Sequence, residues 1–104
     1  MHVTTDTDIR EALRHVVDPE IGVNIVDLGL VYRIEVAGAR ARITMTMTSP
    51  ACPLADYLKA LVTSAIRRAA PDVVDVEITL EWEPPWDPDM MSDEARRQLG
   101  ESER

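Results

Sequence analysis

Three segments of the chain alternate apolar and polar residues, and this pattern constrains the fold more than any other feature of the sequence. The segments are residues 28–36, 40–48 and 74–83. A period of two residues is typical of β-strands that bury one face and expose the other. The first two segments are joined by the short turn 37–39, which predicts an antiparallel hairpin with one buried and one polar face.

Helical periodicity separates the second and third of these segments. Residues 53–69 repeat apolar side chains at helical spacing, Pro53 suits the first helical position, and Pro71 ends the pattern. A helix between two strands forms a crossover connection. We therefore expect strands 40–48 and 74–83 to run parallel, with the usual right-handed connection.

Two further helices are predicted at the ends of the chain. The first follows the N-cap residues at 5–8, carries its apolar stripe over residues 9–17 and ends at Pro19; the last runs from its N-cap Ser92 to Leu99. The predicted fold is α+β, a two-layer α/β arrangement. It has a small three-stranded mixed sheet with helices packed on one face, in the order helix–strand–strand–helix–strand–helix.

Length and composition exclude several classes of protein. A chain of 104 residues is expected to form a single domain over 1–104, with its core at about 6–100, and its one cysteine excludes an intramolecular disulfide. The net charge of −8, the scattered basic residues and the 4% aromatic content argue against nucleic-acid binding. No apolar run reaches the ~18–20 residues of a membrane span, and the N-terminus is acidic, so we expect a cytoplasmic protein with no membrane partner.

The single cysteine is the first candidate functional residue. Cys52 precedes Pro53 and is therefore predicted at the N-cap of the helix 53–69. Free backbone N–H groups and the positive end of the helix dipole stabilise a thiolate there, and a thiolate is what a metal, an iron–sulfur cluster or an electrophile requires. The alternative is that Cys52 is a small buried apolar residue.

The second candidate is the acidic loop that contains Asp18, Glu20 and Asp27. Carboxylates in a loop at the end of a sheet suit hard or borderline metal ions, or a basic partner. The alternative is that these residues terminate the first helix and cap turns. Both interpretations stay open at this point.

The third candidate is the segment Trp82-Glu83-Pro84-Pro85-Trp86. Two indoles that flank a rigid diproline form an exposed ridge able to bind a protein partner. In the alternative interpretation Trp82, which is in phase with the buried face, packs in the core while Trp86 covers an edge of the sheet.

Motifs for catalysis are missing from the sequence. There is no glycine-rich phosphate loop, no serine-nucleophile elbow and no pair of cysteines at CxxC spacing. A thiol enzyme that used Cys52 would need a general base, and the spacing of His15 gives no reason to place it beside the cysteine. We therefore predict that the chain is not an enzyme.

Three motifs in order resemble the metal–sulfur (iron–sulfur) cluster assembly factor domain family, which includes the SUF-system accessory protein and a protein of phenylacetate degradation. They lie at residues 18–32, 46–54 and 82–100, and the resemblance extends over about 8–100. Three motifs in the right order are far more specific than any one alone. One departure is that Ala51 stands where many relatives carry glycine.

The resemblance implies a role in assembling iron–sulfur clusters or delivering them to apoproteins. It makes Cys52 the important residue and metal ligand, with Asp18 and Glu20 as acidic neighbours. One cysteine does not supply the four ligands of an ordinary cluster, so a cluster or iron bound here would be labile and shared, with a second copy in a homodimer or with a client.

The expected partners are iron–sulfur assembly proteins and client apoproteins, docked by Trp86, Glu83 and Asp27. The alternative function is a metal-free adaptor that recruits client proteins to the assembly machinery. It belongs to a different class because it needs no thiolate ligand.

Overall fold

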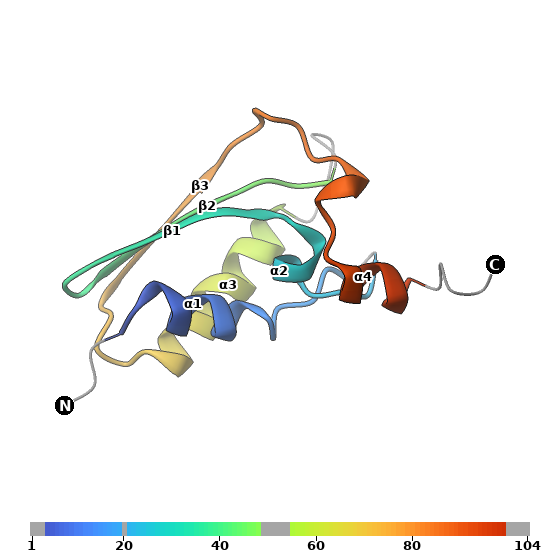
Figure 1. The fold of residues 1–104 in the computed structure, drawn as a ribbon. Helices are drawn as coiled ribbons and strands as arrows, with labels where there is room; N and C mark the ends of the chain where they lie inside the picture. The colour runs from blue at the N-terminus through green and yellow to red at the C-terminus, as the bar shows by residue number, and fades with distance from the viewer. Residues whose placement is uncertain (1–3, 20, 49–54, 100–104) are drawn as a thin grey trace.

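The computed structural model describes residues 4–19, 21–48 and 55–99, and its helices and strands are shown in Figure 1. Their bounds, in chain order, are α1 Asp6–Leu13, α2 Ile25–Leu28, β1 Val31–Ala37, β2 Arg40–Met45, α3 Ala55–Ala69, β3 Asp75–Leu80, the 3-10 turn η1 Pro88–Met90, and α4 Asp93–Gln98. The predicted order is confirmed, with α2 and η1 as two short additions.

The sheet has the order β1-β2-β3, which the sequence pattern left open. β1 pairs with β2 antiparallel, and β2 pairs with β3 in parallel, as the crossover helix α3 predicts. α1 and α3 lie together on one side of this sheet (Figure 1). The α+β class and the mixed three-stranded sheet are therefore confirmed.

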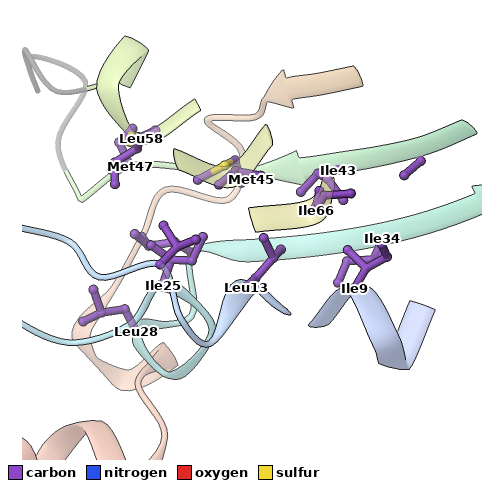
Figure 2. Packing of buried hydrophobic residues seen from close by; sticks show 14 of the residues in the cluster. Ile9, Leu13, Ile25, Leu28, Ile34, Ile43, Met45, Met47, Leu58 and Ile66 are labelled. Carbon is purple, nitrogen blue, oxygen red and sulfur yellow. The ribbon is translucent and has the colours of Figure 1, made fainter. Parts of the chain in front are cut away.

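The core lies between the sheet and these helices. On the central strand, Ala41, Ile43 and Met45 are completely buried, as their alternation predicts. Figure 2 shows side chains from the strands facing Leu13 of α1 and Ile66 of α3. The apolar stripes of both helices and the inner face of β2 thus form one hydrophobic cluster.

The first helix begins within the predicted cluster of N-cap residues but ends earlier than predicted. Its N-cap is Thr5, whose hydroxyl accepts a bond from the Asp8 backbone N–H while the Asp8 carboxylate accepts from the Thr5 N–H. The helix ends at Leu13, well before Pro19. Beyond it the chain turns, and Val17 pairs with Asn24 in an isolated β-bridge. Val17 is 44% exposed, so its prediction as part of the apolar stripe is wrong.

The first strand begins later than predicted because residues 25–28 form the single helical turn α2. Asn24 caps it by accepting a bond from the Asp27 N–H (2.9 Å), and Gly29 ends it in the left-handed region at φ +84°. Leu28, predicted in a strand, instead lies in this short helix, and its side chain is completely buried. Alternation of Leu28 with Leu30 mimics a strand, since both are apolar and two residues apart.

The predicted exposures of several strand residues are also wrong. Thr44 and Thr46 were expected on the polar face, yet they are 5% and 0% exposed. Thr44 lies on the central strand between Arg33 and Thr79, so it has a neighbour on both sides. Val74, in phase with the buried face, is 71% exposed, and Trp82, whose burial was one of two interpretations, is 37% exposed. Both lie outside β3, which spans only Asp75–Leu80.

We predict that Gly29→Ala destabilises the protein by about 3 kcal/mol, while Gly22→Ala costs about 1 kcal/mol. Both glycines have φ +84°, so the conformational cost is matched. A Cβ at Gly29 would lie 2.5 Å from the Met90 carbonyl oxygen, whereas nothing lies within 4 Å of one at Gly22. Urea unfolding of the two variants checks this difference. Equal decreases in the free energy of unfolding would show that Met90 moves away from the added methyl group at little cost.

Candidate functional site

The candidate site is the end of the sheet at which β2 and β3 finish and β1 begins. The Thr46 N–H donates to the Leu30 carbonyl (2.8 Å), and the Glu81 N–H donates to the Met45 carbonyl (2.8 Å), which continues the pairing beyond the strands. α2 and α4 also lie at this end (Figure 1). Segments far apart in the sequence therefore converge where chemistry is usual in open α/β sheets, at the carboxyl ends of parallel strands.

Two predicted site residues, Cys52 and Glu20, lie outside the described residues, and so does the predicted N-terminus of the helix at Pro53. The described residues on either side of 49–54 are well anchored. Met47 is 2% exposed and Leu58 is fully buried, and their side chains lie close together in Figure 2. Described residues before and after the interval 49–54 therefore lie in the core.

Asp18 is the predicted site residue that the structure buries most, with 3% exposure. Its backbone N–H donates to the Val23 carbonyl (3.0 Å), and its carbonyl accepts from the N–H groups of Ile21 (3.2 Å) and Gly22 (2.7 Å). These bonds form the turn that the alternative interpretation expected. A carboxylate this deeply buried must be paired or hydrogen-bonded, so Asp18 is also a fixed polar group inside the loop.

Asp27 joins three separate parts of the chain. Its carboxylate accepts hydrogen bonds from the side chains of Asn24 (2.7 Å), Ser92 (2.9 Å) and Arg14 (3.2 Å), and its carbonyl accepts from the Ser92 N–H (2.8 Å). The bond from Asn24 is the main cause that lowers the pKa of Asp27, with smaller contributions from Ser92 and the Arg14 charge, against a raising effect of burial. Only 12% of the Asp27 side chain is exposed.

Trp86 is also held inside the fold. Its indole N–H donates to the Leu28 carbonyl (2.8 Å), and its ring packs against the core while staying half-buried. The Tyr32 hydroxyl donates to the Pro84 carbonyl (2.6 Å), so the diproline segment is tied to β1 as well. Residues 82–85 of this segment are exposed, and Trp86 is half-buried. Each of the two sequence interpretations was thus right about one indole: Trp82 is exposed, as the ridge predicted, and Trp86 packs at the end of the sheet, close to what the alternative predicted.

Sequence reasoning missed Asn24 and Arg14 and assigned Ser92 only to helix capping. Ser92 does cap α4, since its hydroxyl accepts from the Ala95 N–H (3.1 Å), but it also donates to Asp27. A local signal for Asn24 was available, because Asn and Asp three residues apart, followed by glycine, are typical of a short capped helix. No local signal links Ser92 or Arg14 to Asp27, since these contacts form only in the folded chain.

Within residues 4–19, 21–48 and 55–99, no three His, Cys, Asp or Glu side chains are grouped so that they could hold a metal ion. Cys52 and Glu20 lie outside these ranges. In the same part of the chain, none of the helices is both long and apolar enough to cross a membrane.

Comparison with known proteins places the chain among relatives of nearly equal length. A family model described as "Iron-sulfur cluster assembly protein" matches residues 6–80. The chain is 45% identical over 97 residues to an Fe–S protein maturation auxiliary factor of Porphyromonas gingivalis, covering 92% of this chain and 91% of the relative. It is 46% identical over 94 residues to a protein of the same description in Bacillus subtilis, with 89% and 91% covered.

The chain is also similar to a solved structure and to part of a longer protein. A crystal structure of a domain of unknown function from Bacillus anthracis has a TM-score of 0.89 and 39% identity, with 92% of each chain covered. An iron–sulfur cluster carrier protein of Deinococcus radiodurans is 40% identical over 67 residues; these are 64% of this chain but only 19% of that protein.

We predict that Asp27→Asn lowers the free energy of unfolding by about 1–3 kcal/mol at pH 7 and flattens its acid limb. Because folding lowers the pKa of Asp27, the unfolded state binds the proton more tightly, so the carboxylate stabilises the fold above its unfolded pKa of about 3.9. This contribution is lost as the pH falls through the lower folded value. Urea unfolding from pH 7 down to the acid limit measures the difference.

The matched control is Glu35→Gln, which removes one exposed carboxylate from β1 and should change stability by less than about 0.5 kcal/mol. A difference between wild type and Asp27→Asn that stays constant over the whole pH range would show that the charge of Asp27 does not stabilise the fold.

Proposed function

The chain belongs to the iron–sulfur cluster assembly protein family, and we propose that it acts in the maturation of iron–sulfur proteins as a transient carrier that delivers a cluster or iron through Cys52. The match to the family over residues 6–80 contains both Asp18 and Cys52. The names of the relatives, which are maturation auxiliary factors and a cluster carrier, support this role. Its cargo is the cluster or iron; no resident cofactor is part of the proposal.

The observation that carries the proposal is where the only thiol of the chain lies in the sequence. Cys52 lies in the sequence between Met47 and Leu58, and both of these residues are buried in the core. A thiolate is the side chain that iron and iron–sulfur clusters select. We assign Cys52 the ligand role and Asp18 and Glu20 the supporting acidic roles in the neighbouring loop.

A single thiolate also determines how the cargo would be held. An ordinary cluster has four protein ligands, so the others must come from a second copy of the chain or from the client. A cluster held in this way has few bonds to break on this chain when client thiolates replace Cys52. The ligand count therefore suits transfer better than storage.

The proposal gives the diproline segment the contact with partners, which are client apoproteins and other assembly proteins. Glu83 is exposed, and the outer part of Trp86 is accessible while its N–H stays bound to Leu28. Asp27 was predicted as a third contact. Its carboxylate holds three side chains and is 12% exposed, so we assign it the positioning of α4 beside this segment.

We predict that wild-type protein reconstituted anaerobically with ferrous iron and sulfide develops cluster absorbance, and that Cys52→Ser loses it. A hydroxyl is a much poorer ligand than a thiolate, and no second cysteine can replace it. Ultraviolet–visible spectra and iron analysis measure the loss. Ser49→Ala, a change in the same segment that removes no thiol, is the control and should keep the absorbance.

Circular dichroism and urea unfolding establish that Cys52→Ser is folded. Equal absorbance in wild type and Cys52→Ser would contradict the ligand role. If the wild type takes up no iron yet still binds assembly proteins and clients in pull-downs, the metal-free adaptor is the correct function.

A further inference from the structure

The outer edge of β3 is free among the described residues, because this strand pairs only with β2. The Asp75 N–H donates to the Ala39 carbonyl (3.2 Å) and the Glu81 N–H to the Met45 carbonyl (2.8 Å), so the odd-numbered residues direct their backbone groups toward β2. The backbone groups of Val76, Ile78 and Leu80 therefore point away from the sheet, since they alternate along a strand. This edge offers an unused row of donors and acceptors.

The same three residues carry an apolar stripe. Val76, Ile78 and Leu80 are in register with Ala41, Ile43 and Met45, and so face the helix side of the sheet. Their partners on β2 are completely buried, but Val76, Ile78 and Leu80 are only half-buried. Val74 and Trp82, 71% and 37% exposed, continue the stripe at its two ends. The helices thus leave apolar surface uncovered beneath β3.

The opposite edge of the sheet is different. On β1, Ile34 is only 9% exposed because α1 packs against this strand. The apolar residue at the middle of β1 is thus covered by a helix, whereas Ile78 at the middle of β3 is only half-buried.

Acidic residues alternate with this stripe at Asp75, Glu77, Glu81 and Glu83. Asp75 pairs with Arg40 (3.0 Å) and Glu77 with Arg42 (3.3 Å), yet the two carboxylate side chains remain 57% and 52% exposed. Exposed pairs of this kind are weak and leave each carboxylate able to accept a second cation. Within the described part of the chain, Glu81 and Glu83 have no ion pair, so the edge is acidic toward solvent.

These charges indicate whether the β3 edge pairs with a second copy of the chain or with a strand of another protein. If two copies of β3 paired antiparallel about Ile78, Asp75 of each copy would lie opposite Glu81 of the other. Like charges directly opposite each other destabilise a strand pair. The charge pattern therefore opposes pairing with a second copy and favours a strand that carries positive charges.

We propose that the free edge of β3 binds an extended segment of a partner protein in which apolar residues alternate with lysine or arginine. The segment adds a fourth strand by backbone hydrogen bonds to Val76, Ile78 and Leu80. Its apolar side chains cover the half-buried stripe, and its cations lie beside Asp75, Glu77 and Glu81. This binding uses no atom of Cys52, so it can succeed or fail independently of cluster transfer.

The test uses the full chain labelled with ¹⁵N and a blocked peptide of about seven residues, the usual length of a strand, in which lysine alternates with valine. We expect saturable shifts of the amides of residues 74–82, with slowed hydrogen exchange at Val76, Ile78 and Leu80. A peptide with glutamate in place of lysine should bind at least about fivefold more weakly, since each opposed charge pair contributes up to about that factor.

Glu81→Lys should weaken the binding of the lysine peptide by about fivefold. Glu35→Lys makes the same charge change on β1 and should leave the affinity of the peptide within about twofold of the wild-type value. Circular dichroism establishes that both variants are folded. The proposal is overturned if no amide of 74–82 shifts up to about 1 mM peptide, if the two peptides bind equally, or if Glu81→Lys has no effect. The proposal would also be overturned if sedimentation showed dimers that form with rising protein concentration and dissociate when the lysine peptide is added. The partner at the β3 edge would then be a second copy of the chain.

Discussion

The end of the fold that holds the candidate site depends on the hydrogen bonds that the Asp27 carboxylate accepts. It links the end of α1, the short helix α2 and the start of α4 through Arg14, Asn24 and Ser92. Hydrogen bonds to an ionised group are about twice as strong as neutral ones, and here they replace water around a mostly buried charge. Because α4 has a single buried residue, Ala95, it lacks the apolar area to dock without this anchor.

Docking of α4 and the preceding turn in turn fixes the surroundings of the diproline segment. Met90 lies directly over Gly29, and Trp86 donates to the carbonyl of Leu28, so α2 is held from both sides. Residues of α2 and of the segment 81–92 thus pack together at this end of the sheet. In the sequence, Cys52 lies between Met47 and Leu58, two residues that are buried in the core.

The fold class could be predicted from the sequence because its evidence is local and periodic. Ile43 and Met45 are buried as their alternation requires, and the helix α3 forces β2 and β3 to be parallel. Exposure at Val74, Trp82, Thr44 and Thr46 could not be predicted, since it depends on which elements cover each strand. The same limit applies to the site. Cys52 and the acidic loop stand out by residue type and spacing, whereas the bond from Ser92 to Asp27 joins residues far apart in sequence.

The proposed metal ligand and the proposed binding edge involve different residues and are tested separately. The central claim is that Cys52 holds iron or a cluster in transit, and the most direct measurement is the iron and acid-labile sulfide content of protein purified anaerobically. We predict that both are present, at less than one full cluster per chain because the ligands are shared. We also predict that both fall to background in Cys52→Ser. Background levels in wild type, or equal levels in wild type and Cys52→Ser, would contradict the claim.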